Sequence, residues 1–291
     1  MLKITKVKFS SLFIFAFSLL PLWSFSWPQE EAESDSFYSY FGQARGNTIQ
    51  SSMIFRDTST VKSADQGQVV AVLTEHGDDF GWFESTLGNA VIISHSDSLL
   101  SVYANLEEDL DESLFDAKIV KSGETIGESG SSGWQEGQSC LEFGIIDTKS
   151  HSSINPRVLM PRIGKENELY IGEISLVDRN KKTFILGKDR VLLSGNYSIY
   201  RKRQKRAVPY RTAVSVNGAA VEVISYDTLK ENDGRLCVQG NSFYPYEVLY
   251  PDSERQLICQ CVLTKGKNLI TVTVTDILGK TSSVNYSLEV K

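Results

Sequence analysis

Short apolar runs alternate with turns rich in glycine, serine and asparagine along most of this chain. The pattern is clearest between residues 90 and 144. There the runs Ala90–Ser94 and Leu99–Ala104 flank turn-forming residues at 95–98, which predicts a hairpin. A further short strand, Glu124–Glu128, is predicted between glycine-containing turns. This spacing indicates consecutive strands of one compact β structure.

The same pattern continues to the C-terminus without a predicted helix. Asn217-Gly218 lies between two alternating runs and predicts a two-residue hairpin turn. Thr271-Val-Thr-Val-Thr has period two, which places Val272 and Val274 on one face of a strand. The last two runs, 268–276 and 284–290, resemble the final hairpin of bacterial immunoglobulin-like modules. We therefore expect an all-β chain whose second part is an immunoglobulin-like β-sandwich.

The first 26 residues have the pattern of a secretory signal peptide. Three lysines precede an apolar run over 12–23, and serines occupy positions −3 and −1 relative to Trp27. The run is shorter than the roughly 20 residues that span a bilayer, which favours cleavage before Trp27 over a membrane anchor. The mature chain is expected in the periplasm or cell envelope, without a stable membrane anchor.

Charge adds two points to this interpretation. Without residues 1–26 the chain has 27 basic and 36 acidic side chains, a net charge of −9. So acidic a chain is a poor general binder of nucleic acid. Against that background one basic run stands out. The run is either a surface that contacts an anionic polymer or lipid head groups, or a solvated loop. The run contains Arg201, Lys202, Arg203, Lys205 and Arg206.

The four cysteines are compatible with a disulfide, with buried thiols or with part of a metal site. Cys259 and Cys261 lie two apart on one predicted strand and point to the same face. Either can meet Cys237 in a disulfide, and an oxidising compartment permits one. A Cys-x-Cys half zinc site is the alternative to buried thiols or one disulfide.

A series of motifs occurs in order between residues 40 and 158: Gly67-Gln-Val-Val-Ala-Val, Gly88-Asn-Ala-Val-Ile-Ile-Ser-His, Ser101-Val-Tyr-Ala-Asn-Leu, Val120-Lys-Ser-Gly-Glu-Thr-Ile-Gly-Glu-Ser-Gly, Leu141-Glu-Phe-Gly-Ile and Ile154-Asn-Pro. Their order and spacing resemble those of LytM/lysostaphin-type zinc metallopeptidases, which cleave peptide cross-links of bacterial cell wall. The predicted organisation is a flexible leader over 27–39, a LytM-type β-sheet or barrel-sandwich domain over 40–160, a linker over 161–168 and the immunoglobulin-like domain over 169–291.

The resemblance implies zinc held by His and Asp side chains, with a further His as general base. The family's first ligand pair comes from a His-x-x-x-Asp motif, yet residues 50–62 contain no histidine. Its Tyr-x-His-Leu motif falls on Tyr103–Leu106, which puts Asn105 at the catalytic position. Its closing His-x-His motif falls on Cys140 and Glu142. Since an amide takes up no proton at neutral pH, Asn105 cannot serve as a base.

Two further residues, His95 and Tyr103, are candidates for the groove around these positions. His95 matches a histidine that the family has at a strand end, outside the metal set. The simplest interpretation of this lone histidine is a structural surface residue. An alternative metal set combines Asp57, His95, Cys140 and Glu142.

The sequence thus predicts a LytM-like envelope protein without catalytic residues and without a cofactor. Degenerate LytM domains are associated with control of cell-wall amidases, so the resemblance implies binding to peptidoglycan, to an amidase or to another envelope protein. The alternative is an active zinc metalloendopeptidase with an atypical metal site, acting on peptidoglycan cross-links. A third interpretation is a purely structural protein with two adhesive modules.

Overall fold

The computed structural model describes residues 25–30, 33, 35–56, 59–76, 85–110, 114, 119–133, 139–204 and 207–291. The predicted signal peptide therefore lies almost wholly outside the described residues. Within the described part of the chain, no helix has the length and apolar character needed to cross a membrane.

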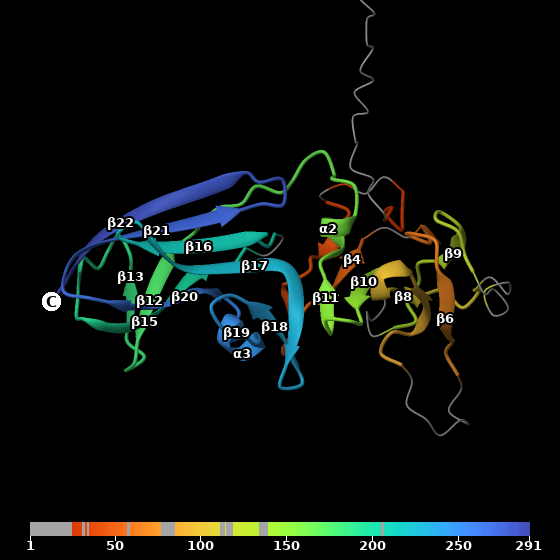
Figure 1. The fold of residues 1–291 in the computed structure, drawn as a ribbon, viewed down its shortest axis with the longest axis horizontal. Coiled ribbons are helices and arrows are strands. Elements are labelled where there is room, and N and C mark those ends of the chain that lie inside the picture. The colour runs from red at the N-terminus through yellow and green to blue at the C-terminus, as the bar shows by residue number, and fades with distance from the viewer. Residues whose placement is uncertain are drawn as a thin grey trace, which may run out of the picture.

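Short strands dominate the first half, as the sequence predicted (Figure 1). The predicted hairpin at 95–98 is confirmed, because β7 and β8 pair antiparallel across it. The described elements of this half are β1 (Phe37–Ser39), β2 (Ala44–Arg45), β3 (Thr48–Ile49), β4 (Ser52–Phe55), β5 (Thr60–Lys62), β6 (Gln68–Leu73), β7 (Asn89–Ser94), the 3-10 turn η2 (Ser96–Ser98), β8 (Leu99–Leu106), β9 (Thr125–Glu128), β10 (Glu142–Asp147), β11 (Ser152–Ile154) and helix α2 (Pro156–Leu159).

Strand β10 is the centre of this half. It pairs with β8 along one edge, and with β4 and then β11 along the other. Glu142 at its start lies opposite Ala104 of β8 and opposite Ile54 of β4. The side chains that begin β10 are therefore flanked on both sides by backbone.

The second half consists of two facing β layers (Figure 1). One layer contains β14, β22, β21, β16 and β17, and the other contains β13, β12, β15 and β20. Apolar side chains from both layers form one buried cluster between them, while assignment to the immunoglobulin-like class stays a prediction. The elements are β12 (Ile174–Asp178), β13 (Thr183–Ile185), β14 (Val191–Leu192), β15 (Gly195–Lys202), β16 (Arg211–Val216), β17 (Ala219–Asn232), β18 (Arg235–Gln239), β19 (Phe243–Tyr244), α3 (Tyr246–Leu249), β20 (Arg255–Leu263), β21 (Gly266–Thr275) and β22 (Thr281–Val290).

The two halves share one sheet and one hydrophobic core. Strand β11 of the first half pairs antiparallel with the long strand β17 of the second, with Ile154 opposite Thr228. This pairing joins the strands of both halves into a 14-stranded sheet. Side chains of both halves also belong to one buried cluster, among them Phe41, Ile49, Tyr226 and Leu229. The predicted domains are consequently not independent units joined by a free linker.

The leader predicted to be flexible over 27–39 is packed where the structure describes it. The Trp27 indole lies 5.7 Å from the Phe37 ring and donates its N–H to the Pro161 carbonyl at 2.9 Å. Phe25, two residues before Trp27, is only 2% exposed. The prediction failed because burying large aromatic side chains outweighs the disorder that acidic and serine residues favour.

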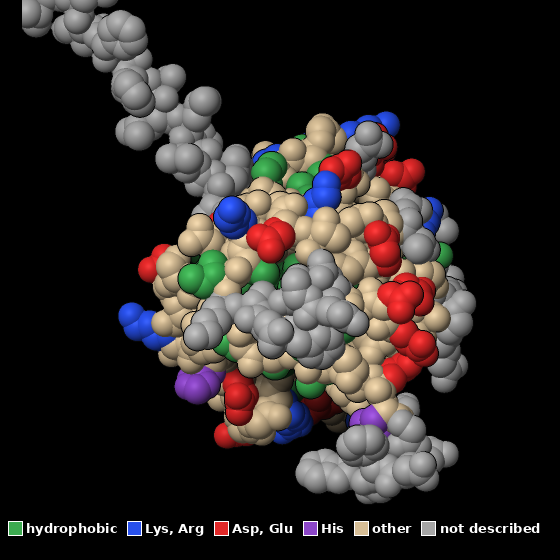
Figure 2. Space-filling model, turned by 90° about the vertical axis from the view of Figure 1, so that its right-hand side faces the viewer, with side chains coloured by type: hydrophobic (Ala, Val, Ile, Leu, Met, Phe, Trp, Pro, Cys, Tyr) green, Lys and Arg blue, Asp and Glu red, His purple; other side chains and the backbone are tan. Residues whose placement is uncertain are grey.

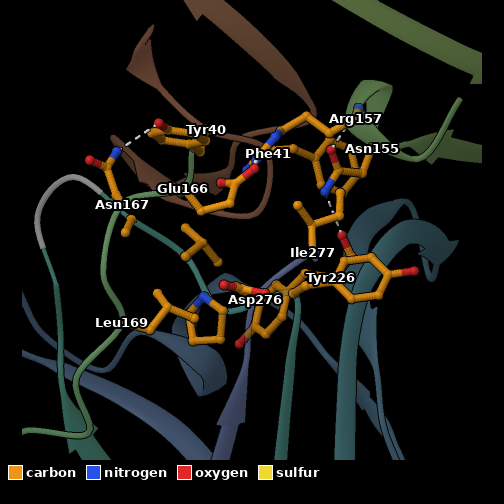
Figure 3. Close-up of a pocket in the computed structure, with 14 residues that line it drawn as sticks. Tyr40, Phe41, Asn155, Arg157, Glu166, Asn167, Leu169, Tyr226, Asp276 and Ile277 are labelled. Atoms are coloured by element: carbon orange, nitrogen blue, oxygen red, sulfur yellow. Dashed lines mark hydrogen bonds and ion pairs between the residues drawn. The ribbon is translucent and has the colours of Figure 1, made fainter. Parts of the chain in front are cut away.

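The predicted linker over 161–168 is also tied down. Glu166 forms an ion pair with Arg157 of α2, and Asn167 donates to the Tyr40 hydroxyl at 2.9 Å (Figure 3). In the same region Asn155 donates to the Tyr226 carbonyl at 2.9 Å. These groups surround a cavity of about 20 Å³, room for about one water molecule.

Asn155 is hydrogen-bonded across the two halves, so its replacement tests their coupling. Its side chain donates to Tyr226 and also accepts from the Arg157 N–H at 3.2 Å, which caps α2. We expect Asn155→Ala to lower the free energy of unfolding by about 1–2 kcal/mol, measured by urea denaturation. The control Asn180→Ala, in an exposed turn, should stay within about 0.5 kcal/mol of the parent. Equal stability of both variants would contradict the coupling.

Candidate functional site

Three residues identified from the sequence, Asn105, Cys140 and Glu142, lie together in the structure. Asn105 belongs to β8, and its neighbour Ala104 is opposite Glu142 of β10. The Asn105 amide donates to the Cys140 carbonyl at 2.7 Å and approaches the Cys140 sulfur at 3.4 Å. The residues at the family's catalytic position and closing ligand positions thus form one cluster.

Asn105 serves as a backbone cross-link in this cluster. Its Nδ2 donates to the Gly130 and Cys140 carbonyls, and its Oδ1 accepts from the Gly133 N–H at 2.8 Å. The backbone of Asn105 has φ 65°, a left-handed conformation that asparagine tolerates better than most residues. Gly130 is required beside it, since a Cβ there would lie 2.5 Å from the Glu107 nitrogen. With both ends of its amide engaged, Asn105 holds two loops together.

Cys140 is a buried thiol, only 1% exposed. Burial, and next the nearby Glu142 carboxylate, raise its pKa to about 11. At neutral pH the sulfur therefore keeps its proton. A metal would have to displace this proton to bind the sulfur.

Glu142 is neutralised by an arginine that the sequence analysis did not single out. Arg45 Nη1 lies 2.7 Å from Glu142 Oε1, and both side chains are less than a fifth exposed. Ser52 donates its hydroxyl to the same carboxylate oxygen at 2.5 Å. Gln50 contacts both Ser52 and Arg45, at 2.5 and 3.2 Å. We call these four residues (Arg45, Gln50, Ser52 and Glu142) the Arg45 cluster. Within it the Arg45 guanidinium compensates the charge of the Glu142 carboxylate.

Strand β4 borders the same cluster. Ile54 of β4 lies directly opposite Glu142, and Gln50 precedes it by four residues, the spacing of the family's His-x-x-x-Asp motif. An alkyl side chain cannot bind a metal, and the Gln50 amide is already hydrogen-bonded.

The zinc ion that the family implies does not fit these residues. Both ends of the Asn105 amide are already hydrogen-bonded, and Arg45 would repel a dication beside Glu142. In the described ranges, no group of three or more His, Cys, Asp or Glu side chains is arranged to bind a metal.

The two groove candidates have structural roles instead. His95 is 8% exposed, and its ring nitrogens contact the Gln66 carbonyl at 2.9 Å and the Ser101 hydroxyl at 2.7 Å. It precedes β8, whose far end holds Asn105, so it is neither a surface residue nor part of the cluster. Tyr103 is fully buried and accepts a hydrogen bond from the Ala64 N–H at 2.7 Å. Asp57 of the alternative metal set lies outside the described residues.

The basic run does not form one exposed patch. Arg201 is 0% exposed, which removes it from the surface. The Arg203 guanidinium covers the Tyr250 ring at 4.8 Å, and exposed Lys202 lies 4.0 Å from Glu254. Lys205 and Arg206 fall outside the described residues. The basic residues on β15 are divided between a buried and an exposed position, because alternate side chains of a strand point to opposite faces.

The cysteines are unpaired in the structure. The predicted disulfide from Cys237 to Cys259 or Cys261 is not formed; the Cys237 sulfur instead lies 3.5 Å from the Arg235 carbonyl. A hydrogen bond from Cys259 lowers the pKa of the Cys261 thiol. The predicted Cys-x-Cys half site gains no third ligand among the residues that the structure describes.

An acidic groove of about 380 Å³ begins next to Asn105. Figure 2 faces this end of the molecule and shows Asp and Glu side chains gathered along one side. The exposed carboxylates of Glu107 and Glu108 directly follow β8. The lining residues are Glu75, Leu106, Glu107, Glu108, Asp109, Glu128, Ser131 and Ser132.

Comparison with known proteins identifies the first half. The model of a family described as peptidase family M23 matches residues 49–156. A second family model matches residues 168–291. A protein of unassigned function from Treponema pallidum is 34% identical over 122 residues, which are 39% of this chain and 80% of the relative.

Solved structures show partial likeness. The catalytic domain of the prophage-encoded M23 protein EnpA from Enterococcus faecalis has a TM-score of 0.31 and 20% identity, covering 38% of this chain and 80% of its own. The complex of SpoIIIAH and SpoIIQ has a TM-score of 0.35 and 20% identity, covering 47% of this chain and 99% of the matched chain.

The Arg45–Glu142 pair should be coupled more strongly than an exposed pair. Removing one partner leaves a poorly solvated charge, so we expect a coupling energy of about 1–3 kcal/mol in a double-mutant cycle with Arg45→Met and Glu142→Gln. The control cycle uses Arg235 and Glu247, whose side chains are 60% and 54% exposed. That pair should couple by less than about 1 kcal/mol. Equal values from urea denaturation would show that Arg45 is not needed to hold Glu142.

Proposed function

We propose that this chain, which belongs to peptidase family M23 through residues 49–156, is an exported member of that family that binds a partner in the cell envelope and does not hydrolyse peptide bonds. The Arg45 cluster is the single observation that carries the proposal. A hydrolase of this family needs a Lewis-acidic metal and a base beside its bound water. Here the corresponding positions hold an ion pair, a protonated thiol and a hydrogen-bonded amide.

Export is proposed from the N-terminal pattern. Lysines, a short apolar run and small residues before Trp27 are typical of a secretory signal. The net charge of −9 after cleavage, from 27 basic and 36 acidic side chains, suits a role without nucleic acid.

The acidic groove supports a protein partner with basic residues. Glu107, Glu108 and Asp109 are all exposed at its rim. A surface of this charge attracts a basic protein, because complementary potentials speed encounter and fix the orientation of docking. The same charge disfavours wall strands that carry many carboxylates. We therefore favour an envelope protein, such as a wall amidase, over peptidoglycan itself as the partner.

A zinc endopeptidase with an atypical site has less support. His95 and Glu142 lie at opposite ends of the paired strands β8 and β10. His95 precedes Leu99, which lies opposite Asp147. Glu142 lies opposite Ala104, at the other end of the pair. Those five residue steps correspond to about 16 Å, far beyond ligand distances of about 2–2.3 Å. The alternative ligand set is thus not assembled in the described residues.

Metal analysis with a hydrolysis assay tests the absence of catalysis. We expect the purified full chain, incubated with equimolar zinc and dialysed, to retain well under one zinc per chain, measured by plasma mass spectrometry. Isolated sacculi should release no soluble fragments. A Glu142→Gln preparation serves as the control, since lysis that persists in it comes from a contaminant. Stoichiometric zinc together with chelator-sensitive lysis that this variant abolishes would overturn the proposal.

Charge reversal tests the binding surface. We expect Glu107→Lys with Glu108→Lys to weaken binding to a purified envelope amidase by roughly tenfold at low salt, because two attractive charges become repulsive. Glu231→Lys with Glu289→Lys changes the net charge equally at exposed positions of the second half and serves as the control. Equal weakening in both variants would exclude the groove as the site. Binding to sacculi instead of the amidase would favour peptidoglycan as the partner.

A further inference from the structure

Two cysteines of the second half, Cys259 and Cys261, lie next to each other on one face of β20. One residue separates them, so both side chains point toward the buried cluster between the two layers. Cys259 is fully buried, whereas Cys261 is partly exposed and lines a groove of about 340 Å³. Strand β20 is also the last strand of its layer, so one of its edges has no neighbour in that sheet. The pair can therefore be reached from solvent through Cys261.

The two thiols interact directly. Cys259 donates a hydrogen bond to the Cys261 sulfur, which lowers the pKa of the Cys261 thiol and raises the pKa of Cys259. Cys261 is thus the thiol that loses its proton first, and the thiolate is the form of cysteine that binds metals. Neither sulfur belongs to a disulfide. Two sulfur ligands already face each other at this site.

Strand geometry disfavours a disulfide between these two residues. Residues two apart on a strand are separated by about 6.6 Å, and side chains on one face keep about this spacing at their Cβ atoms. A disulfide needs a Cβ–Cβ distance of about 3.5–4.5 Å. A metal ion lengthens the bridge, because each metal–sulfur bond measures about 2.3 Å and sulfurs about 4.6 Å apart can share one ion. The spacing therefore suits a bridging ion better than a direct bond.

The surroundings offer such an ion no further ligand. Glu222 of β17 acts on Cys259 from the facing layer, but its carboxylate already accepts a hydrogen bond from the Tyr244 hydroxyl at 2.5 Å. Over the described ranges, no three His, Cys, Asp or Glu side chains are grouped to hold a metal. The methionines that the structure describes, Met53 and Met160, belong to the other buried cluster. Zinc, which takes four ligands in structural sites, is not satisfied by two thiolates.

We infer that Cys259 and Cys261 bind one soft monovalent metal ion, of the Cu(I) or Ag(I) class, in a two-coordinate thiolate site. Thiolates are the ligands that soft ions prefer, and these ions accept two ligands in a nearly linear arrangement. On binding, both S–H bonds break, two metal–sulfur bonds form, two protons go to solvent and no electron is transferred. Arg179 lines the same groove and offsets part of the resulting single negative charge. The inference is independent of the proposed function, because β20 lies outside residues 49–156.

Titration of the reduced full chain with Ag(I), which keeps its oxidation state in air, tests the inference. We expect one tightly bound ion per chain, counted by native mass spectrometry. Cys261→Ser should weaken binding more than about 100-fold, because changes outside the ligand shell already cost about 10–100-fold in metal affinity. Cys237→Ser removes a buried thiol of β18 and should bind as the parent does. Unchanged affinity in Cys261→Ser, or an equal loss in Cys237→Ser, would overturn the inference.

X-ray absorption of the unmodified chain covers the case that Cys261→Ser does not fold. After loading with Cu(I) in the absence of oxygen, the metal should have a first shell of two sulfur atoms without nitrogen or oxygen. A shell of three or four sulfurs, or one that contains nitrogen, would show that other residues hold the ion and would refute the two-coordinate site.

Discussion

Pairing of β11 with β17 is the contact on which the arrangement of the two halves depends. The three residues of β11 border β10 on one side and β17 on the other. Because β10 carries Glu142 and β17 carries Tyr226, this short strand links the Arg45 cluster of one half to the core of the other. Asn155, which follows β11, strengthens the link through Tyr226. A sheet that continues through both halves leaves little freedom for one to move against the other.

Charge compensation explains how a carboxylate is held between two strands at the start of β10. Arg45 neutralises Glu142 while Ser52 and Gln50 complete the hydrogen bonds. A carboxylate left between two strands without a counter-charge would cost several kcal/mol. The residues at this end are thus mutually consistent, and a metal ligand set beside Arg45 would be unfavourable.

Sequence reasoning succeeded where the signal is local. Asn217 and Gly218 form the predicted turn with φ values of 53° and 83°, a conformation that this pair adopts readily. It failed where contacts join distant residues: Arg45 meets Glu142 across 97 positions, and Trp27 meets Pro161 across 134. No local pattern marks such pairs. Acidic and serine residues around Trp27 therefore suggested flexibility, although its indole had a partner elsewhere.

Arg45 and Arg201 differ in how their charge is compensated. Arg45 has a carboxylate partner within the chain, so its charge is part of the fold and needs nothing from solution. Arg201 has the same charge and less exposure but no such partner. Neighbouring strands could have hidden an apolar side chain there at no electrostatic cost, and replacement of buried charges by apolar residues is often stabilising. The buried charge of Arg201 therefore lowers the stability of the second half relative to an apolar side chain, whereas the charge of Arg45 is compensated.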